Sequence, residues 1–170
     1  MKTKKQEKLI NNFLSELSDE LRPLYGEIID CLSDCGYNPQ KERTNLSFKH
    51  NLHNKQMAKM GFRNPNGFSF FALRFSACTG YSQRFCDIVC AMIEKYPSKI
   101  AMCVDGNCRY CAGEPLTHVY THICQNGETK FHCGAYALEI PNLSVEDIAE
   151  IKLLVTEEHR YLMKYQVGIE

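Results

Sequence analysis

The stretch N-P-N-G-F-S-F-F-A-L-R-F, residues 64–75, decides the fold. It opens with a strong turn signal, because Pro, Asn and Gly each favour turn backbone. The rest, residues 68–75, carries aromatic and aliphatic side chains on both faces of a strand. A strand that is apolar on both faces is covered on both, so we expect it in the middle of a sheet. The alternating residues 46–50 and the short run at 57–62 supply its neighbours.

Helical patterns flank this sheet in the sequence. Apolar residues recur at helical spacing over residues 5–35, which predicts a pair of helices ended by Gly36. Ser82 can cap a helix that runs to about residue 96, and residues 144–164 predict a long terminal helix. We therefore expect an α+β fold with an N-terminal helical hairpin, an antiparallel sheet with one crossing helix, a metal-stapled β-hairpin and a C-terminal helix.

The length of the chain bounds the number of domains. Its 170 residues, of which 44% are hydrophobic, can fill one core, so we expect a single domain over residues 1–170. Its expected parts are a helical hairpin (1–36), a sheet with a helix (45–97), a metal-binding loop with a hairpin (98–140) and the C-terminal helix (144–165).

The charge and the cysteine content narrow the class of protein. Lys+Arg and Asp+Glu number 20 each, which disfavours nucleic-acid binding through a global basic field. No stretch approaches the roughly 18 apolar residues of a membrane helix, and the N-terminus lacks the apolar segment of a secretory signal. We therefore expect a cytoplasmic protein with no membrane partner. In that compartment its ten cysteines are thiols or metal ligands rather than a disulfide framework.

Four cysteines in the C-terminal half have the spacing of a metal site. Cys103, Cys108 and Cys111 read C-x4-C-x2-C, and Cys133 stands in a Cys-Gly pair. Zinc takes four tetrahedral ligands, and thiolates are favoured in closed structural sites. We predict a structural zinc held by these four residues. An iron–sulfur cluster is the less favoured cofactor, and a group of buried free thiols is the alternative without metal.

The hairpin that carries Cys133 is predicted from Asn126-Gly127, which lies between two alternating runs. A two-residue loop there puts Cys133 opposite Tyr120. Cys124 then lies ~13 Å from Cys133 along the ladder and does not share its ion.

The same register sorts the histidines near the hairpin. His132 is expected on the face opposite Cys133, because side chains alternate along a strand. His118 and His122 are expected as diagonal neighbours of Cys133, so either can replace Cys103 as the fourth ligand.

A second candidate site lies where the central strand meets the N-terminus of the crossing helix. Free backbone N–H groups attract anions there. Arg74, Ser82 and Arg84 are candidate ligands of a phosphate or carboxylate, and Tyr81 is a candidate to stack on a ring. The alternative is a well-capped loop with a surface arginine. The chain has no phosphate-loop, dinucleotide-binding or common hydrolase motif, so whether it is an enzyme stays open.

Two further cysteine pairs stand at i, i+4 on predicted helices. They are Cys31 with Cys35 and Cys86 with Cys90. Packing on one helical face is the favoured interpretation, and a second metal site or a redox pair is the alternative.

Several segments resemble a family of small, uncharacterised, cysteine-rich bacterial proteins. They are Leu46-Ser-Phe-Lys-His50, Phe70-Phe-Ala-Leu-Arg-Phe-Ser-Ala-Cys78, Cys108-x2-Cys111, His118-Val-Tyr, Cys133-Gly134 and Ile140-Pro-Asn-Leu143. The resemblance covers roughly residues 45–160. It implies a bacterial, cytosolic α+β domain and no particular activity.

Three functional hypotheses follow. The favoured one is a binding or regulatory module with a structural zinc, which binds a small ligand or a protein through the sheet and the Tyr81 loop. The second is a small enzyme that acts on an anionic substrate at the Arg74–Arg84 loop. The third, which is not favoured, is a nucleic-acid-binding zinc module that uses Arg109, Tyr110 and the basic N-terminus.

Overall fold

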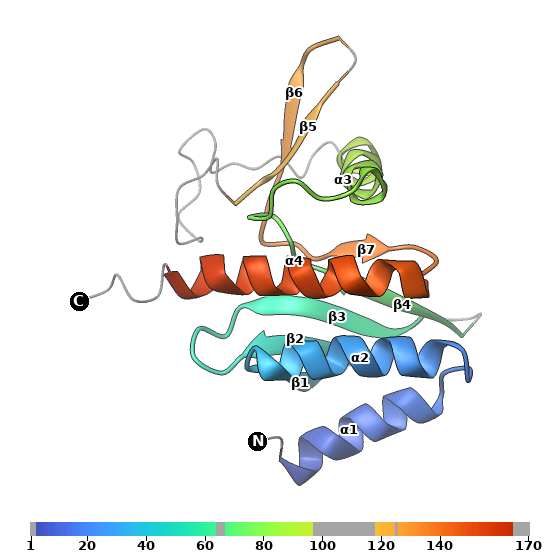
Figure 1. Ribbon diagram of the computed structural model, residues 1–170. Coiled ribbons are helices and arrows are strands. Elements are labelled where there is room, and N and C mark those ends of the chain that lie inside the picture. Colours follow the sequence, from blue (N-terminus) through green and yellow to red (C-terminus); the bar gives the residue numbers. More distant parts are fainter. Residues whose placement is uncertain (1–2, 64–66, 97–117, 125, 165–170) are drawn as a thin grey trace.

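The structure is a computed structural model that describes residues 3–63, 67–96, 118–124 and 126–164. The described part contains four helices, an antiparallel sheet of five strands and a separate two-stranded hairpin (Figure 1), which confirms the predicted α+β fold. The helices are α1 (Lys4–Ser15), α2 (Leu21–Asp34), α3 (Gln83–Lys95) and α4 (Val145–Lys164). The strands are β1 (Tyr37–Glu42), β2 (Asn45–His50), β3 (Gln56–Arg63), β4 (Phe68–Leu73), β5 (Tyr120–Ile123), β6 (Thr129–His132) and β7 (Leu138–Ile140).

The predicted inner strand is β4. The strand order of the sheet is β1-β2-β3-β4-β7, so β4 has a partner on each side. Phe71 and Leu73 are fully buried on one face, and Ala72 is covered on the other. Phe68, at the start of the strand, is 71% exposed, because it lies beyond the end of β7, which pairs only with Phe71 to Leu73.

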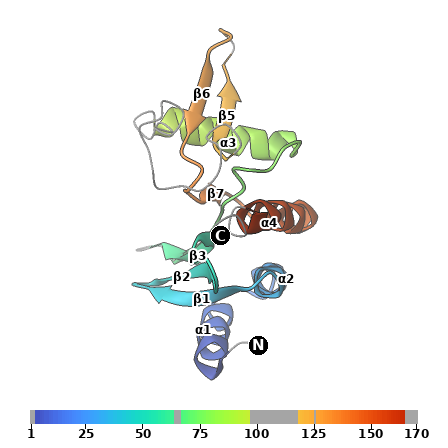
Figure 2. The same cartoon turned by 90° about the vertical axis from the view of Figure 1, so that its left-hand side faces the viewer.

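Helices α2 and α4 lie side by side on one face of the sheet, and α1 lies beside β1 at one end (Figure 2). The core forms between these helices and the sheet. Tyr25 of α2 meets Phe71 edge-on, with ring centroids 6.4 Å apart, and Phe13 of α1 meets Tyr25 at 5.3 Å. Burial of each such large side chain contributes about 1.5–3 kcal/mol to the free energy of unfolding. Helix α3 and the hairpin lie beyond β7, at the opposite end from α1 (Figure 1).

Strand β1 was not expected from the sequence. Asn38, Pro39 and Gln40 interrupt any alternating pattern, and proline removes a ladder donor. The structure tolerates Pro39 because β1 is an edge strand. Tyr37 anchors this strand, since its side chain is fully buried.

The last strand also differs from expectation. The part expected as a metal-binding loop with a hairpin ran to residue 140, but β7 leaves the hairpin and pairs with β4. Ile140 lies opposite Phe71 and Leu138 opposite Leu73, so the strand adds its apolar side chains to the main core. The hairpin β5–β6 is thereby a separate two-stranded sheet that packs on α3.

The predicted hairpin register is wrong by one residue. Tyr120 pairs with His132 rather than with Cys133, and the N–H of Cys124 donates to the carbonyl of Glu128 at 2.8 Å. The loop is therefore one residue longer than the expected two. Gly127 has a φ of 80°, which is the left-handed conformation that such three-residue loops require.

A group of aromatic rings joins the sheet to α4. The rings of His50 and His53 stack at 4.2 Å, and Tyr37 and His159 pack against His50 at 5.0 and 5.5 Å. The backbone N–H groups of Leu52 and Lys55 donate to the Nδ1 atoms of His50 and His53. The two imidazoles therefore hold the β2–β3 loop as neutral rings.

None of the helices in the described ranges is long and apolar enough to cross a membrane.

Candidate functional site

Arg74, the first predicted anion ligand, lies inside the protein. Its Nε is 2.6 Å from Oε1 of Glu158 on α4, and the two side chains are 6% and 0% exposed. The other oxygen of Glu158 accepts the N–H of Ala77 at 2.7 Å, and Ser76 donates to Glu158 at 3.4 Å. Arg74 therefore ties the end of β4 to α4.

The N-terminus of α3 is also occupied by the protein's own groups. Ser82 is the N-cap residue, but its hydroxyl makes no capping bond; instead its N–H donates to Glu150 at 2.6 Å. Arg84 pairs with both oxygens of Asp147, at 2.5 and 2.9 Å, and donates to the carbonyl of Pro141. An external anion at this helix end must displace Glu150 or Asp147.

The four predicted ligands do not meet at one place. Tyr81 lines a cavity of about 680 Å³ together with Cys78 and Cys86, whereas Arg84 lines a different cavity and Arg74 lines neither. Tyr81 packs edge-on against Phe75 at 5.4 Å, and its burial raises the pKa of its hydroxyl to about 12. The anion site stays a prediction, and its cations are already paired with carboxylates.

Of the predicted zinc ligands, only Cys133 lies in the described part of the chain. Cys103, Cys108 and Cys111 fall outside the described residues. Cys133 is a half-buried free thiol directly after β6. Within the described ranges, no group of three or more His, Cys, Asp or Glu side chains is placed to hold a metal ion.

The surroundings of Cys133 show where residues 97–117 rejoin the described chain. A Cβ added to Gly134 would lie 1.6 Å from the carbonyl oxygen of His118, so only glycine fits there. Residue 118, which follows the predicted cysteine cluster, thus touches the residue that follows Cys133. This contact is compatible with a shared ligand set. His118 is buried, and its ring stacks on Tyr161 at 6.2 Å.

The corrected register changes the role of His122. It lies on the face of Tyr120 and His132, not on that of Cys133, because Tyr120 pairs with His132. His122 Nε2 instead contacts the Sγ of Cys90 on α3 at 3.3 Å. Burial, followed by the nearby carboxylate of Glu94, raises the pKa of Cys90, so this thiol stays protonated at neutral pH.

An open groove runs between α3 and the face of the sheet opposite α2 and α4. We call it the α3 groove. It consists of two adjoining cavities of about 580 and 800 Å³, which share Arg63, Met92, Tyr96 and Glu139. Volumes of this size are typical of small-molecule sites. Sequence analysis missed this groove, because its walls come from segments that no local pattern connects.

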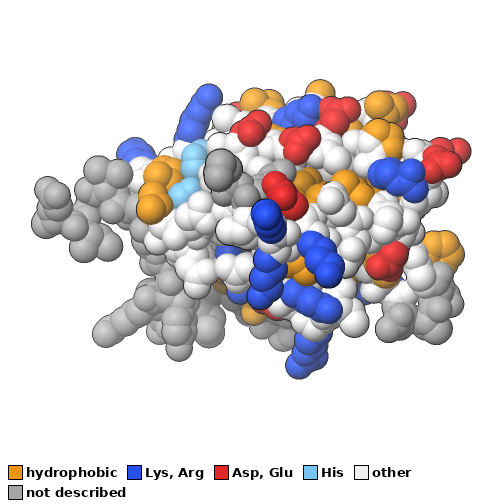
Figure 3. Space-filling view, turned by 90° about the horizontal axis from the view of Figure 1, so that it is seen from below, with side chains coloured by type: hydrophobic (Ala, Val, Ile, Leu, Met, Phe, Trp, Pro, Cys, Tyr) orange, Lys and Arg blue, Asp and Glu red, His pale blue; other side chains and the backbone are white. Residues whose placement is uncertain are grey.

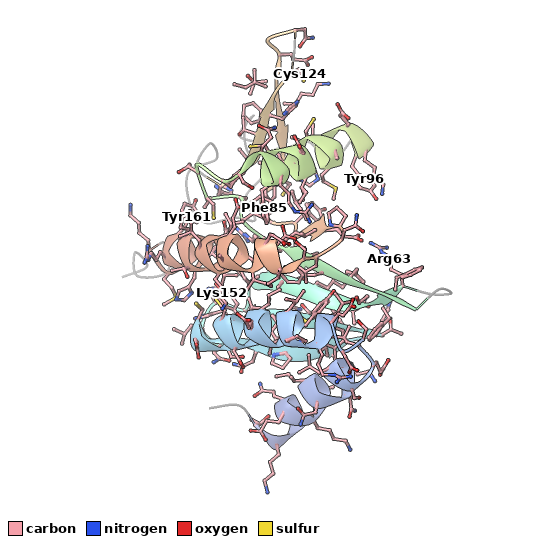
Figure 4. The ribbon with its side chains drawn as sticks, turned by 45° about the vertical axis from the view of Figure 1, so that its right-hand side comes forward. Arg63, Phe85, Tyr96, Cys124, Lys152 and Tyr161 are labelled. Atoms are coloured by element: carbon pink, nitrogen blue, oxygen red, sulfur yellow. The ribbon has the colours of Figure 1, made fainter. Side chains whose placement is uncertain are left out.

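Two cation–aromatic contacts line the α3 groove. The guanidinium of Arg63 lies 5.1 Å from the ring centre of Phe70 and is paired with Glu139, and the ammonium of Lys95 lies 5.4 Å from that of Tyr96. In Figure 4, Arg63 and Tyr96 lie on the same side of the molecule, and Lys152 lies on the other. The sequence contains one weak signal for this groove, because Tyr96 is an aromatic residue at the end of an amphipathic helix.

The nucleic-acid hypothesis requires a basic surface, and the charged side chains of the surface are of both signs. Seen from below, Lys and Arg side chains gather in a band, and Asp and Glu side chains lie mainly to one side of it (Figure 3). Two lysines of the sheet share one carboxylate: Glu42 lies 3.2 Å from Lys49 and 3.4 Å from Lys59, and the hydrogen bond from Lys49 lowers the pKa of Glu42.

No protein-family model, curated protein or solved structure matches this chain. Function is therefore inferred from the geometry of the described residues.

Proposed function

We propose that the chain is a small-ligand-binding module in which a structural zinc, held by Cys103, Cys108, Cys111 and Cys133, supports one wall of the α3 groove. The observation that carries this proposal is the position of Cys133. It directly follows His132, and Tyr136 comes soon after; both of these residues line the groove. A metal at Cys133 would fix the backbone between two residues of the groove wall.

The thiol chemistry favours a closed structural site. Four thiolates leave no open coordination position for a reacting water, so zinc there would hold the base of the hairpin rather than perform catalysis. The expected cytoplasmic location belongs to the same proposal, because thiolates stay reduced in that compartment. The bacterial origin rests on the sequence resemblance alone.

The test is the metal content of the purified full chain, measured by mass spectrometry. We expect about one equivalent of zinc. Cys108→Ser and Cys133→Ser should lose the metal and lower the unfolding temperature, because metal-binding energy is then folding energy. Cys124→Ser is the matched control, since Cys124 is also a half-buried free thiol but lies at the far end of the hairpin. It should keep the zinc.

Less than half an equivalent of any metal, with no change on chelation, would refute the zinc proposal. Bound iron with visible absorbance would instead support the iron–sulfur cluster. Equal metal loss in Cys124→Ser and Cys133→Ser would exclude the ligand set named above.

A further inference from the structure

The two halves of the α3 groove differ in chemistry. One half has an apolar floor made by Ile88, Ala91, Met92 and Pro141. The adjoining half presents the polar side chains of Thr44, Asn45 and Lys59. A ligand that fills both halves therefore has an apolar end and a polar end.

Flat aromatic surfaces line the α3 groove, and one of them, Tyr96, is shared by its two halves. Tyr96 and Tyr136 are 37% and 48% exposed, although both are large aromatic residues, and Phe70 forms part of the sheet surface beneath Arg63. In the described ranges the two cation–π contacts, Arg63 with Phe70 and Lys95 with Tyr96, both line this groove. An aromatic face can stack on a flat neutral ring, and a cation beside it can pair with a negative group attached to that ring.

The charge of the groove favours an anion. Lys59, Arg63 and Lys95 line it, against Asp87 and Glu139; Arg84 also lines it but is neutralised by Asp147. The Nζ of Lys59 is 3.4 Å from Glu42, well beyond the 2.7–2.9 Å or so of a strong charge-assisted bond, so this ammonium is only loosely held. Glu139 holds the guanidinium of Arg63 over Phe70 and thereby fixes its orientation.

We propose that the α3 groove binds a nucleoside phosphate, with the base against the apolar floor and the phosphate at Lys59 and Arg63. The ligand is a phosphate-bearing aromatic base, whether as a free nucleotide or as one unit of a single strand. This inference rests on the proposed binding module and names its ligand class.

The experiment is isothermal titration calorimetry of the full chain with the four ribonucleoside monophosphates, with adenosine and with a single-stranded oligoadenylate. We expect saturable binding of at least one monophosphate or of the oligonucleotide. Adenosine should bind about tenfold more weakly than AMP, because it cannot make the charged hydrogen bonds. Tighter binding of the oligonucleotide per nucleotide would assign the site to a strand, and equal binding would assign it to the free nucleotide.

Three variants locate the site. Lys59→Met and Arg63→Met should each weaken binding about tenfold, and Ala91→Trp should block the apolar half without disturbing the core, since Ala91 is exposed. The control is Lys152→Met, because Lys152 is a surface cation in an ion pair with Glu27 on the other side of the molecule. The affinity of this variant for the nucleotide should stay within about twofold of that of the unmodified chain.

Failure to bind any monophosphate or the oligonucleotide would overturn the proposal. Equal affinity for AMP and adenosine, or equal weakening by Lys152→Met and Arg63→Met, would overturn it as well. Zinc is measured in the same samples. Full zinc content without nucleotide binding would leave the metal proposal intact and refute only this ligand.

Discussion

The buried pair of Arg74 and Glu158 yields the sharpest stability prediction. Glu158→Gln keeps the size of the side chain and still allows its carbonyl to accept the N–H of Ala77. It removes the charge that lies 2.6 Å from a guanidinium whose side chain is 6% exposed. Removing one partner of such a pair leaves an uncompensated buried charge, which costs about 3–5 kcal/mol.

That loss is large enough to measure directly. For a chain of this length it lowers the unfolding temperature by roughly 6–20 °C. The assay is urea unfolding followed by circular dichroism, with the slope of the transition checked for two-state behaviour. The matched control is Glu27→Gln, which breaks the exposed ion pair with Lys152 and should cost no more than about 1 kcal/mol.

A double variant separates charge from packing. Arg74→Met in the Glu158→Gln background removes both charges and keeps the acceptor for the Ala77 N–H, so it should recover most of the stability lost in Glu158→Gln. The reasoning is refuted if Glu158→Gln costs no more than Glu27→Gln. It is also refuted if the double variant is as unstable as the single one.

Two further predictions concern acid and a pair of glycines. Burial lowers the pKa values of three histidines on and beside α4, which are His50, His53 (pKa about 4) and His159. Their neutral forms therefore contribute stability that is present above pH 6.5 and is lost as the pH falls through the folded-state pKa values. The urea concentration at the unfolding midpoint should therefore decrease as the pH is lowered from about 6.5 to 4, and His53→Asn should make this decrease smaller. An equal decrease in the variant would contradict the assignment. Gly134→Ala should destabilise strongly, because its Cβ would meet the His118 carbonyl at 1.6 Å. Gly26→Ala, with nothing within 4 Å and a helical position, should stabilise by about 0.5–1 kcal/mol, and thermal unfolding that ranks the two glycine variants the other way would refute this reasoning.

The sequence was sufficient to predict the elements whose pattern is local. The turn signal at residues 64–67 and the apolar run after it predicted β4 correctly, and apolar periodicity predicted the four helices. Strand β1 escaped prediction because Pro39 is acceptable only at an edge, and edge position is a property of the whole sheet. The hairpin register depended on a loop length that Asn126-Gly127 did not fix.

The candidate site was harder to predict for a similar reason. Arg74 and Arg84 looked like free cations because their carboxylate partners lie 84 and 63 residues away, on α4. The α3 groove joins Arg63 to Tyr96 across a sheet and a helix, and no spacing rule connects them. The zinc ligand set stays a prediction that metal analysis can decide.

The proline in β1 has a consequence for contacts between copies of this protein. An edge strand with a continuous row of amide donors can recruit a strand from a neighbouring molecule and start aggregation. Pro39 interrupts that row on the β1 edge, and α3 contacts β7 at the other edge. Strand-to-strand growth is thus disfavoured at both ends of the five-stranded sheet.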